Sequence, residues 1–135
     1  MYKVGEIMGS YILMLIESII EKETLKVSKK EIKKKIPFLI RDYEINDGEL
    51  DYYIDLAYEN IMRNEIEFFI MEAADGYSKV EIYSTLFAYY HKRNKSLSKL
   101  TISATSNVLT NMINEGKVTF DDEDRIKILN TEKKM

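Results

Sequence analysis

The feature that most constrains this chain is a five-residue pattern that occurs twice, fifty positions apart. Residues 28–32 and residues 78–82 both read S-K-x-E-I. In such a pattern the serine hydroxyl accepts a hydrogen bond from the glutamate amide, and the glutamate side chain accepts one from the serine amide. This capping box marks the first turn of a helix. The pattern therefore predicts helix starts at Ser28 and Ser78.

The surroundings of the two patterns repeat as well. An apolar stretch with helical spacing precedes each pattern, at residues 11–23 and 66–74. An apolar helix end, a polar turn and a strand-like alternation follow each pattern, at residues 60–68 and 111–120. The shared order predicts a duplication into an N-terminal and a C-terminal three-helix unit.

The C-terminal unit, residues 64–135, shows its elements more clearly. Its first helix is expected to stop at Asp75-Gly76, because glycine commonly ends a helix. Alternation on both sides of a short acidic turn is typical of a β-hairpin. We expect a helix over 68–74, a helix from Ser78 to about Lys92, a loop over 93–99, a helix over 101–115, and strands around the turn 121–124.

Three helices followed by a two-stranded hairpin is the order of a winged helix-turn-helix. Residues 64–132 resemble that family in the segment S-K-V-E-I, in the amphipathic helix that ends M-I-N-E-G-K-V, and in the hairpin after it. The resemblance implies a mainly α fold (an α+β winged helix) built from two abutting helix-turn-helix units, the second with a β-hairpin wing. It also implies that the third helix enters the major groove of DNA and that the wing touches the backbone.

The N-terminal unit, residues 1–63, departs from the pattern because no wing is visible in it. Its third helix is expected to begin near residues 47–49 and to run past Ile61. Apolar residues keep helical spacing as far as Ala73, which predicts a single helix that continues into the C-terminal unit. A short strand at residues 66–70 is the alternative, since periodicity does not separate the two here.

The composition excludes several kinds of chemistry. The chain has no cysteine and one histidine, His91, which excludes a disulfide, a thiolate zinc site, a cysteine nucleophile and a histidine metal cluster. It has no glycine-rich phosphate loop and no G-x-S-x-G motif. The acidic run at 121–124 lacks the spacing and the glycine of an EF-hand and is interpreted as a solvated turn. We therefore expect no catalytic residues, no metal and no cofactor.

The net charge and the hydropathy pattern limit the partners. Twenty basic against 23 acidic residues give a net charge of −3, so any affinity for DNA must come from a local patch. The longest apolar run, residues 11–16, is much shorter than the roughly 20 residues that cross a bilayer. The N-terminus shows no signal-peptide pattern. We expect a cytoplasmic protein that does not enter a membrane.

The third helix of the C-terminal unit is the candidate reading helix. A helical wheel places one apolar side toward the core, with Ile102, Thr105, Leu109, Met112 and Ile113. The opposite side is uncharged, with Ala104, Asn114 and four candidate base contacts, Ser103, Asn107, Thr110 and Asn111. Asparagine pairs with adenine through two hydrogen bonds, and serine or threonine serves several bases. The alternative is an ordinary solvated helix face.

Cations for phosphate contact lie in two segments. One is the stretch before the reading helix, with Lys92, Arg93, Lys95 and Lys99. The other is one face of the helix that begins at Ser28, with Lys29, Lys30, Lys33 and Lys34. Contacts to phosphate hold a protein in register on the duplex and supply most of the affinity. Solvated, lysine-rich surface is the alternative interpretation of both.

Two acidic features argue against DNA binding. The expected wing tip consists of four carboxylates, residues 121–124, where a wing that touches the backbone needs Arg or Lys. Asp51, Asp55 and Glu59 form an acidic stripe at four-residue spacing on the third helix of the N-terminal unit. Such a helix is unsuited to a groove of DNA.

The first helix, residues 4–21, is apolar over more than half of its circumference, whereas an ordinary surface helix needs an apolar arc of about 100°. The apolar surface beyond that arc predicts a homodimer, in which Leu13, Ile16 and Ile20 form the interface. The twofold symmetry of such a dimer matches a palindromic site. The alternative is a helix buried entirely inside the protomer.

These observations lead to one functional hypothesis and one alternative. The first is a small winged-helix protein that binds double-stranded DNA and regulates transcription. The alternative is a module of the same fold that binds a protein partner and has no role on DNA, which the acidic features favour.

Overall fold

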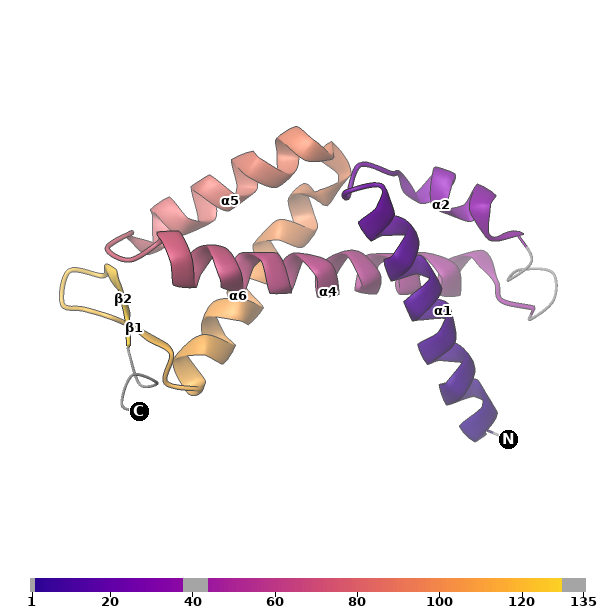
Figure 1. The fold of residues 1–135 in the computed structure, drawn as a ribbon, viewed down its shortest axis with the longest axis horizontal. Coiled ribbons are helices and arrows are strands. Elements are labelled where there is room, and N and C mark those ends of the chain that lie inside the picture. The colour runs from indigo at the N-terminus through magenta and orange to yellow at the C-terminus, as the bar shows by residue number, and fades with distance from the viewer. Residues whose placement is uncertain (1, 38–43, 130–135) are drawn as a thin grey trace. The chain divides into compact units, whose positions relative to one another are not determined.

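The computed structural model describes residues 2–37 and 44–129, with side chains from Gly9 onward (Figure 1). The end of the segment that resembles a winged helix, residues 130–132, lies outside them. The described residues form a mainly α fold with a C-terminal antiparallel hairpin, as the sequence predicts. The elements are α1 (Tyr2–Lys22), α2 (Lys29–Lys35), α4 (Asp47–Ala73), α5 (Lys79–Arg93), the 3-10 turn η1 (Lys95–Leu97), α6 (Ser98–Asn114), β1 (Val118–Phe120) and β2 (Ile126–Ile128).

Both capping boxes form. The Ser28 hydroxyl accepts from the Glu31 amide at 3.2 Å, and the Glu31 carboxylate accepts from the Ser28 amide at 3.0 Å. The corresponding distances at Ser78 and Glu81 are 3.1 and 2.8 Å. The hydrogen bond from the serine amide is the main cause of the lowered pKa of both glutamates, Glu31 and Glu81. The two predicted helix starts are confirmed.

Helix α4 is a single helix of 27 residues, and the strand alternative at residues 66–70 is wrong. In a strand, residues 66, 68 and 70 would share one face. Here Ile66 and Ile70 are fully buried whereas the Phe68 side chain is 69% exposed. Residues four apart share a helix face and residues two apart do not, so burial follows the helical period.

The chain divides into two compact units, residues 1–61 and 62–135. The core of the first unit is formed by buried residues of α1, α2, the turn between them and the first part of α4. On α4 the Tyr58 hydroxyl donates a hydrogen bond to the carbonyl oxygen of Val27, in the turn before α2. At Gly9, a Cβ would lie 2.9 Å from the Tyr53 hydroxyl, so the missing side chain allows close packing there.

The buried face of α1 corrects the predicted dimer interface. Ile16 and Ile20 are fully buried inside the protomer, together with Ile12 one turn earlier. Leu13 is half-buried. Ile16 and Ile20 are therefore covered within the first unit and are not available to a second copy.

The second unit contains the end of α4, α5, η1, α6 and the hairpin. Helix α5 packs against α6, and the predicted loop over 93–99 is mostly helical. Helix α5 continues to Arg93, α6 already begins at Ser98, and only η1 separates them. The Asn94 side chain caps η1 by accepting from the Ser96 amide at 3.1 Å, and the buried Leu97 anchors the turn in the core.

The hairpin pairs Val118 with Ile128 and Phe120 with Ile126. The segment between α4 and α5 joins its outer edge. There the Gly76 amide donates to the Ile126 carbonyl oxygen at 2.8 Å, and the Ile126 amide donates to the Tyr77 carbonyl oxygen at 2.8 Å. Backbone pairing therefore holds the hairpin at the start of α5.

Candidate nucleic-acid interface

The predicted reading face lies on the surface of α6. Ser103, Asn107, Thr110 and Asn111 are all exposed. The opposite side of α6 holds the helix in the core through buried residues, Thr101, Ala104, Thr105, Val108, Leu109 and Met112. Lys99 precedes Ser103 by one helical turn and is exposed, so it extends the same face toward the start of α6.

Three residues of α6 lie on other sides of the helix than expected. Ile102 and Ile113 were expected in the core but are 53% and 43% exposed, and Ala104 was expected on the surface but is buried. The centre of the buried side is at Thr105 and Val108, because the small Ala104 and Thr105 allow close packing there. Ile102 and Ile113 consequently flank the polar face at one edge.

Three exposed cations lie in the first turn of α6 and in the segment just before it. Lys92, Lys95 and Lys99 are exposed, and none of them has an ion-pair partner within 4.0 Å among residues 2–37 and 44–129. The His91 ring nitrogen Nδ1 lies 2.9 Å from the Ser98 hydroxyl, which joins the end of α5 to the first residue of α6. The three ammonium groups therefore extend along a short, well-anchored helical connection.

Arg93 does not belong to that group, although the sequence suggests it. Its guanidinium Nη1 lies 2.7 Å from the Tyr89 hydroxyl and 3.5 Å from Glu65 Oε1. The guanidinium also lies over the Tyr89 ring, 5.2 Å from its centroid. With only 19% of its side chain exposed, Arg93 is held inside the second unit and is not presented to phosphate.

Two of the four lysines expected to contact phosphate on α2 are ion-paired. Lys29 Nζ lies 2.9 Å from Asp55, and Lys33 Nζ lies 2.8 Å from Asp51 and 2.9 Å from Asp47. Hydrogen bonds to Asp51 and Asp47 raise the pKa of Lys33. The same contact with Lys33 lowers the pKa of Asp51.

These ion pairs connect two charged features of the sequence, the basic face of α2 and the acidic stripe on α4. The basic face of α2 and most of the acidic stripe on α4 neutralise one another within the first unit. Lys30 and Lys34 remain exposed. The four-lysine phosphate patch on α2 stays a prediction, with Lys29 and Lys33 ion-paired and only Lys30 and Lys34 without such a pair among the described residues.

The side chain of its first residue, Asp121, stabilises the acidic turn of the hairpin. Asp121 Oδ1 accepts from the amides of Glu123 and Arg125 at 2.8 and 3.0 Å, and these bonds lower the pKa of Asp121. Asp124 adopts a positive φ of 60°. Aspartate suits both positions, since it can bond to nearby amides and tolerates left-handed backbone. In the part of the chain that the structure describes, no three His, Asp or Glu side chains are grouped to hold a metal.

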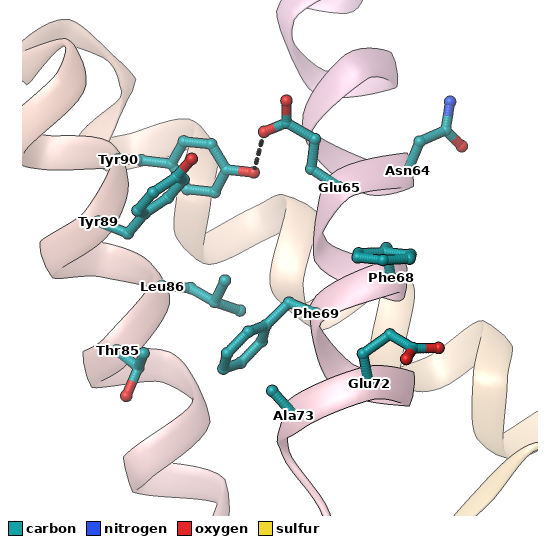
Figure 2. A pocket seen from close by; sticks show the side chains of 10 residues that line it. All are labelled: Asn64, Glu65, Phe68, Phe69, Glu72, Ala73, Thr85, Leu86, Tyr89 and Tyr90. Atoms are coloured by element: carbon teal, nitrogen blue, oxygen red, sulfur yellow. Dashed lines mark hydrogen bonds between the residues drawn. The ribbon is translucent and has the colours of Figure 1, made fainter.

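A groove of about 570 Å³ lies in the second unit between α4 and α5 (Figure 2). Ten residues line it: Asn64, Glu65, Phe68, Phe69, Glu72, Ala73, Thr85, Leu86, Tyr89 and Tyr90. We did not expect this groove from the sequence. The signal that could have indicated it is the adjacent aromatic pair on each helix, because two neighbouring residues of a helix cannot both face the core.

One end of the groove is closed by a contact between its two helices. The Tyr90 hydroxyl on α5 donates to Glu65 Oε1 on α4 at 2.7 Å, as the dashed line in Figure 2 shows. Burial, followed by the bond to Glu65 and the charge of that residue, raises the pKa of Tyr90 well above its ordinary value. The Tyr90 hydroxyl therefore stays protonated at neutral pH and donates to Glu65.

Comparison of the chain with protein-family models, with curated proteins and with solved structures finds no match. Within the described residues, no helix combines the length and the apolar character needed to cross a membrane. The arguments on function therefore rest on the geometry of this chain.

Proposed function

We propose that the protein binds double-stranded DNA as a small winged-helix transcriptional regulator, with α6 in the major groove. The observation that carries this proposal is the exposed, uncharged face of α6, together with the exposed Lys99 in its first turn and the exposed Lys95 and Lys92 in the segment just before it. The major groove of B-DNA is about 12 Å wide and admits a helix, and hydrogen-bonding side chains on that helix can read base edges.

The order of elements in the second unit supports a winged helix. The end of α4, α5 and α6 precede the hairpin, and a single 3-10 turn joins α5 to α6. The extended segment before α5 pairs with the hairpin, so the wing is tied to the helices by backbone hydrogen bonds. This arrangement leaves the polar face of α6 uncovered within the unit.

Base contacts are assigned to Ser103, Asn107, Thr110 and Asn111, which lie on the exposed face. Phosphate contacts are assigned to Lys92, Lys95 and Lys99, and Lys30 and Lys34 of α2 are candidates to extend them. Three phosphate contacts correspond to a slope of about −3 in log K against log salt, since each contributes roughly −0.9. We therefore propose weak binding that is strongest at low ionic strength.

The acidic turn of the hairpin fits a wing that stays off the backbone. Asp122, Glu123 and Asp124 are exposed, and phosphates would repel them over about 8–10 Å at physiological salt. In this proposal the hairpin supports α6 from inside the unit, and α6 makes the contacts with DNA.

A mobility-shift titration on mixed duplex DNA at several salt concentrations tests the proposal. We expect a complex at low salt, whose affinity falls as salt rises. The double variant Lys95→Ala, Lys99→Ala should bind more weakly and with a flatter salt slope, because two phosphate contacts are lost. The matched control is Lys22→Ala, Lys26→Ala, which removes the same charge from exposed positions of the first unit. If no complex forms at low salt, the alternative of a protein-binding module replaces this proposal.

The homodimer remains a proposal as well. From Gly9 to the end of α1, the apolar side chains left for a second copy are the exposed Tyr11 and Met14 and the half-buried Leu13, Leu15 and Ile19. Light scattering at micromolar concentration tests it, and the mass of one chain would refute it.

A further inference from the structure

We propose that the groove between α4 and α5 binds a small lipophilic cation, an apolar aromatic body that carries one ammonium or amidinium group. The volume of about 570 Å³ falls in the range of roughly 300–1,000 Å³ that is usual for small-molecule sites. All ten lining residues belong to the second unit. This inference does not depend on DNA binding.

The walls of the groove suit an apolar body. In Figure 2, Phe69 from α4 and Leu86 from α5 project into the space between the two helices. The rim carries Phe68 and Tyr89, and the Tyr89 side chain is 50% exposed. Exposed aromatic rings on both sides of an apolar floor can enclose a flat molecule, and covering them removes apolar surface from water.

The charge of the groove selects a cation. The ionised groups in its lining are two carboxylates, Glu65 and Glu72, and no lysine or arginine is among the ten residues. Glu65 Oε1 accepts from Tyr90 and Arg93, whereas no hydrogen bond to Glu65 Oε2 is found within the described residues. Arg93 offsets one of the two negative charges. The remaining carboxylate charge favours an ammonium group over a neutral or negative one.

The closed end of the groove favours a compact ligand over a helix of a partner protein. A helix that docks in a groove needs an open channel for anchors at positions i, i+4 and i+7, which extends over about 10 Å. The bond between Tyr90 and Glu65 crosses from α5 to α4 and blocks such a path at this end (Figure 2).

Titration of the whole chain with three naphthalene compounds, followed by amide NMR, tests the inference. The probes are 1-naphthylmethylammonium, 1-naphthylmethanol and 1-naphthylacetate, which share the aromatic body and carry positive, zero and negative charge. We expect shifts at residues 64–73 and 85–90, with the tightest binding for the ammonium probe and the weakest for the carboxylate.

Two variants separate the contributions of charge and shape. Glu65→Gln keeps an acceptor for Tyr90 but removes the charge, so the ammonium probe should bind about two- to fivefold more weakly and no tighter than the alcohol. Ala73→Phe fills the groove and should abolish binding of all three probes. Glu123→Gln, which removes the same charge at the exposed hairpin turn, is the control and should change nothing.

Three results would overturn the inference: no shifts at these residues, equal affinity for the three charges, or tighter binding of the carboxylate. If the same amides shift when the protein alone is concentrated, the groove binds a second copy and the inference is also wrong.

Discussion

The ammonium of Lys33 on α2 lies 2.8 Å from the carboxylate of Asp51 on α4. Lys33 also reaches Asp47 at 2.9 Å, and Lys29 reaches Asp55 one helical turn further along α4. Two charge patterns that bear on DNA binding in opposite directions are thus partners in one ion-pair ladder. The ladder neutralises part of the basic face of α2 within the first unit.

The variant Lys33→Met tests the ladder while keeping most of the apolar stem. Because these groups are partly exposed, we expect a loss of about 0.5–1 kcal/mol in the free energy of unfolding at pH 7. Lys33 lowers the pKa of Asp51, so this stability is present above the ordinary aspartate pKa and is lost as pH falls through the lowered value. Urea unfolding at pH 7 and near pH 3 should therefore show a difference between variant and wild type that is smaller at the lower pH. A difference of equal size at both pH values would contradict the ladder, and the exposed Lys34→Met is the control.

The capping boxes predict a matched pair of stability losses. Ser28→Ala and Ser78→Ala each remove a hydroxyl that accepts from the amide at the third helical position, which costs about 1 kcal/mol. Thermal unfolding followed by circular dichroism measures the loss. Ser106→Ala, on the exposed side of α6, should not lower the unfolding temperature. Equal stability of the capping variants and the control would contradict the role of the boxes.

Ile16→Ala distinguishes a core position from a dimer interface. Ile16 is fully buried in the protomer, so its truncation should lower the free energy of unfolding by about 2–5 kcal/mol. In this account the loss is the same at every protein concentration. A loss that grows as the protein is diluted would show instead that Ile16 is covered by a second copy.

The composition of the reading face predicts a preference for A·T base pairs. Between Ser98 and Asn114, helix α6 contains no arginine and one lysine, so the commonest partners of guanine are nearly absent. Asn107 and Asn111 suit adenine, and the exposed Ile102 can contact a thymine methyl group. In competition assays, a duplex of A·T pairs should displace the bound probe at lower concentration than a G·C duplex of equal length. Asn111→Ala should reduce this preference by about 1–3 kcal/mol, and equal competition by both duplexes would contradict the assignment.

The local features of the fold could be predicted from the sequence. A capping box connects residues three apart, and a hairpin depends on alternation around one turn, so both are visible without tertiary information. The same holds for the long helix α4, whose apolar spacing continues through Ile66. Sequence alone left the strand alternative open there, and the exposure of Phe68 decides it.

Features that depend on packing could not be predicted in the same way. The helical wheel of α6 assigned Ile102 to the core because it is apolar, but Ala104 is buried there and Ile102 is 53% exposed. The pairing of Lys33 with Asp51 depends on how α2 lies on α4. The groove depends on which ring of Phe68-Phe69 and which ring of Tyr89-Tyr90 faces inward. Both members of each pair are aromatic, so the sequence does not indicate which one that is.

Amide NMR of the chain during titration with a duplex of about twenty base pairs at low salt tests whether α6 contacts DNA. We expect the largest shifts along α6, from Ser98 to Asn114, and at Lys92 and Lys95, with little change at the hairpin turn 121–124. An absence of shifts, or shifts confined to α2 or to the hairpin turn, would contradict it.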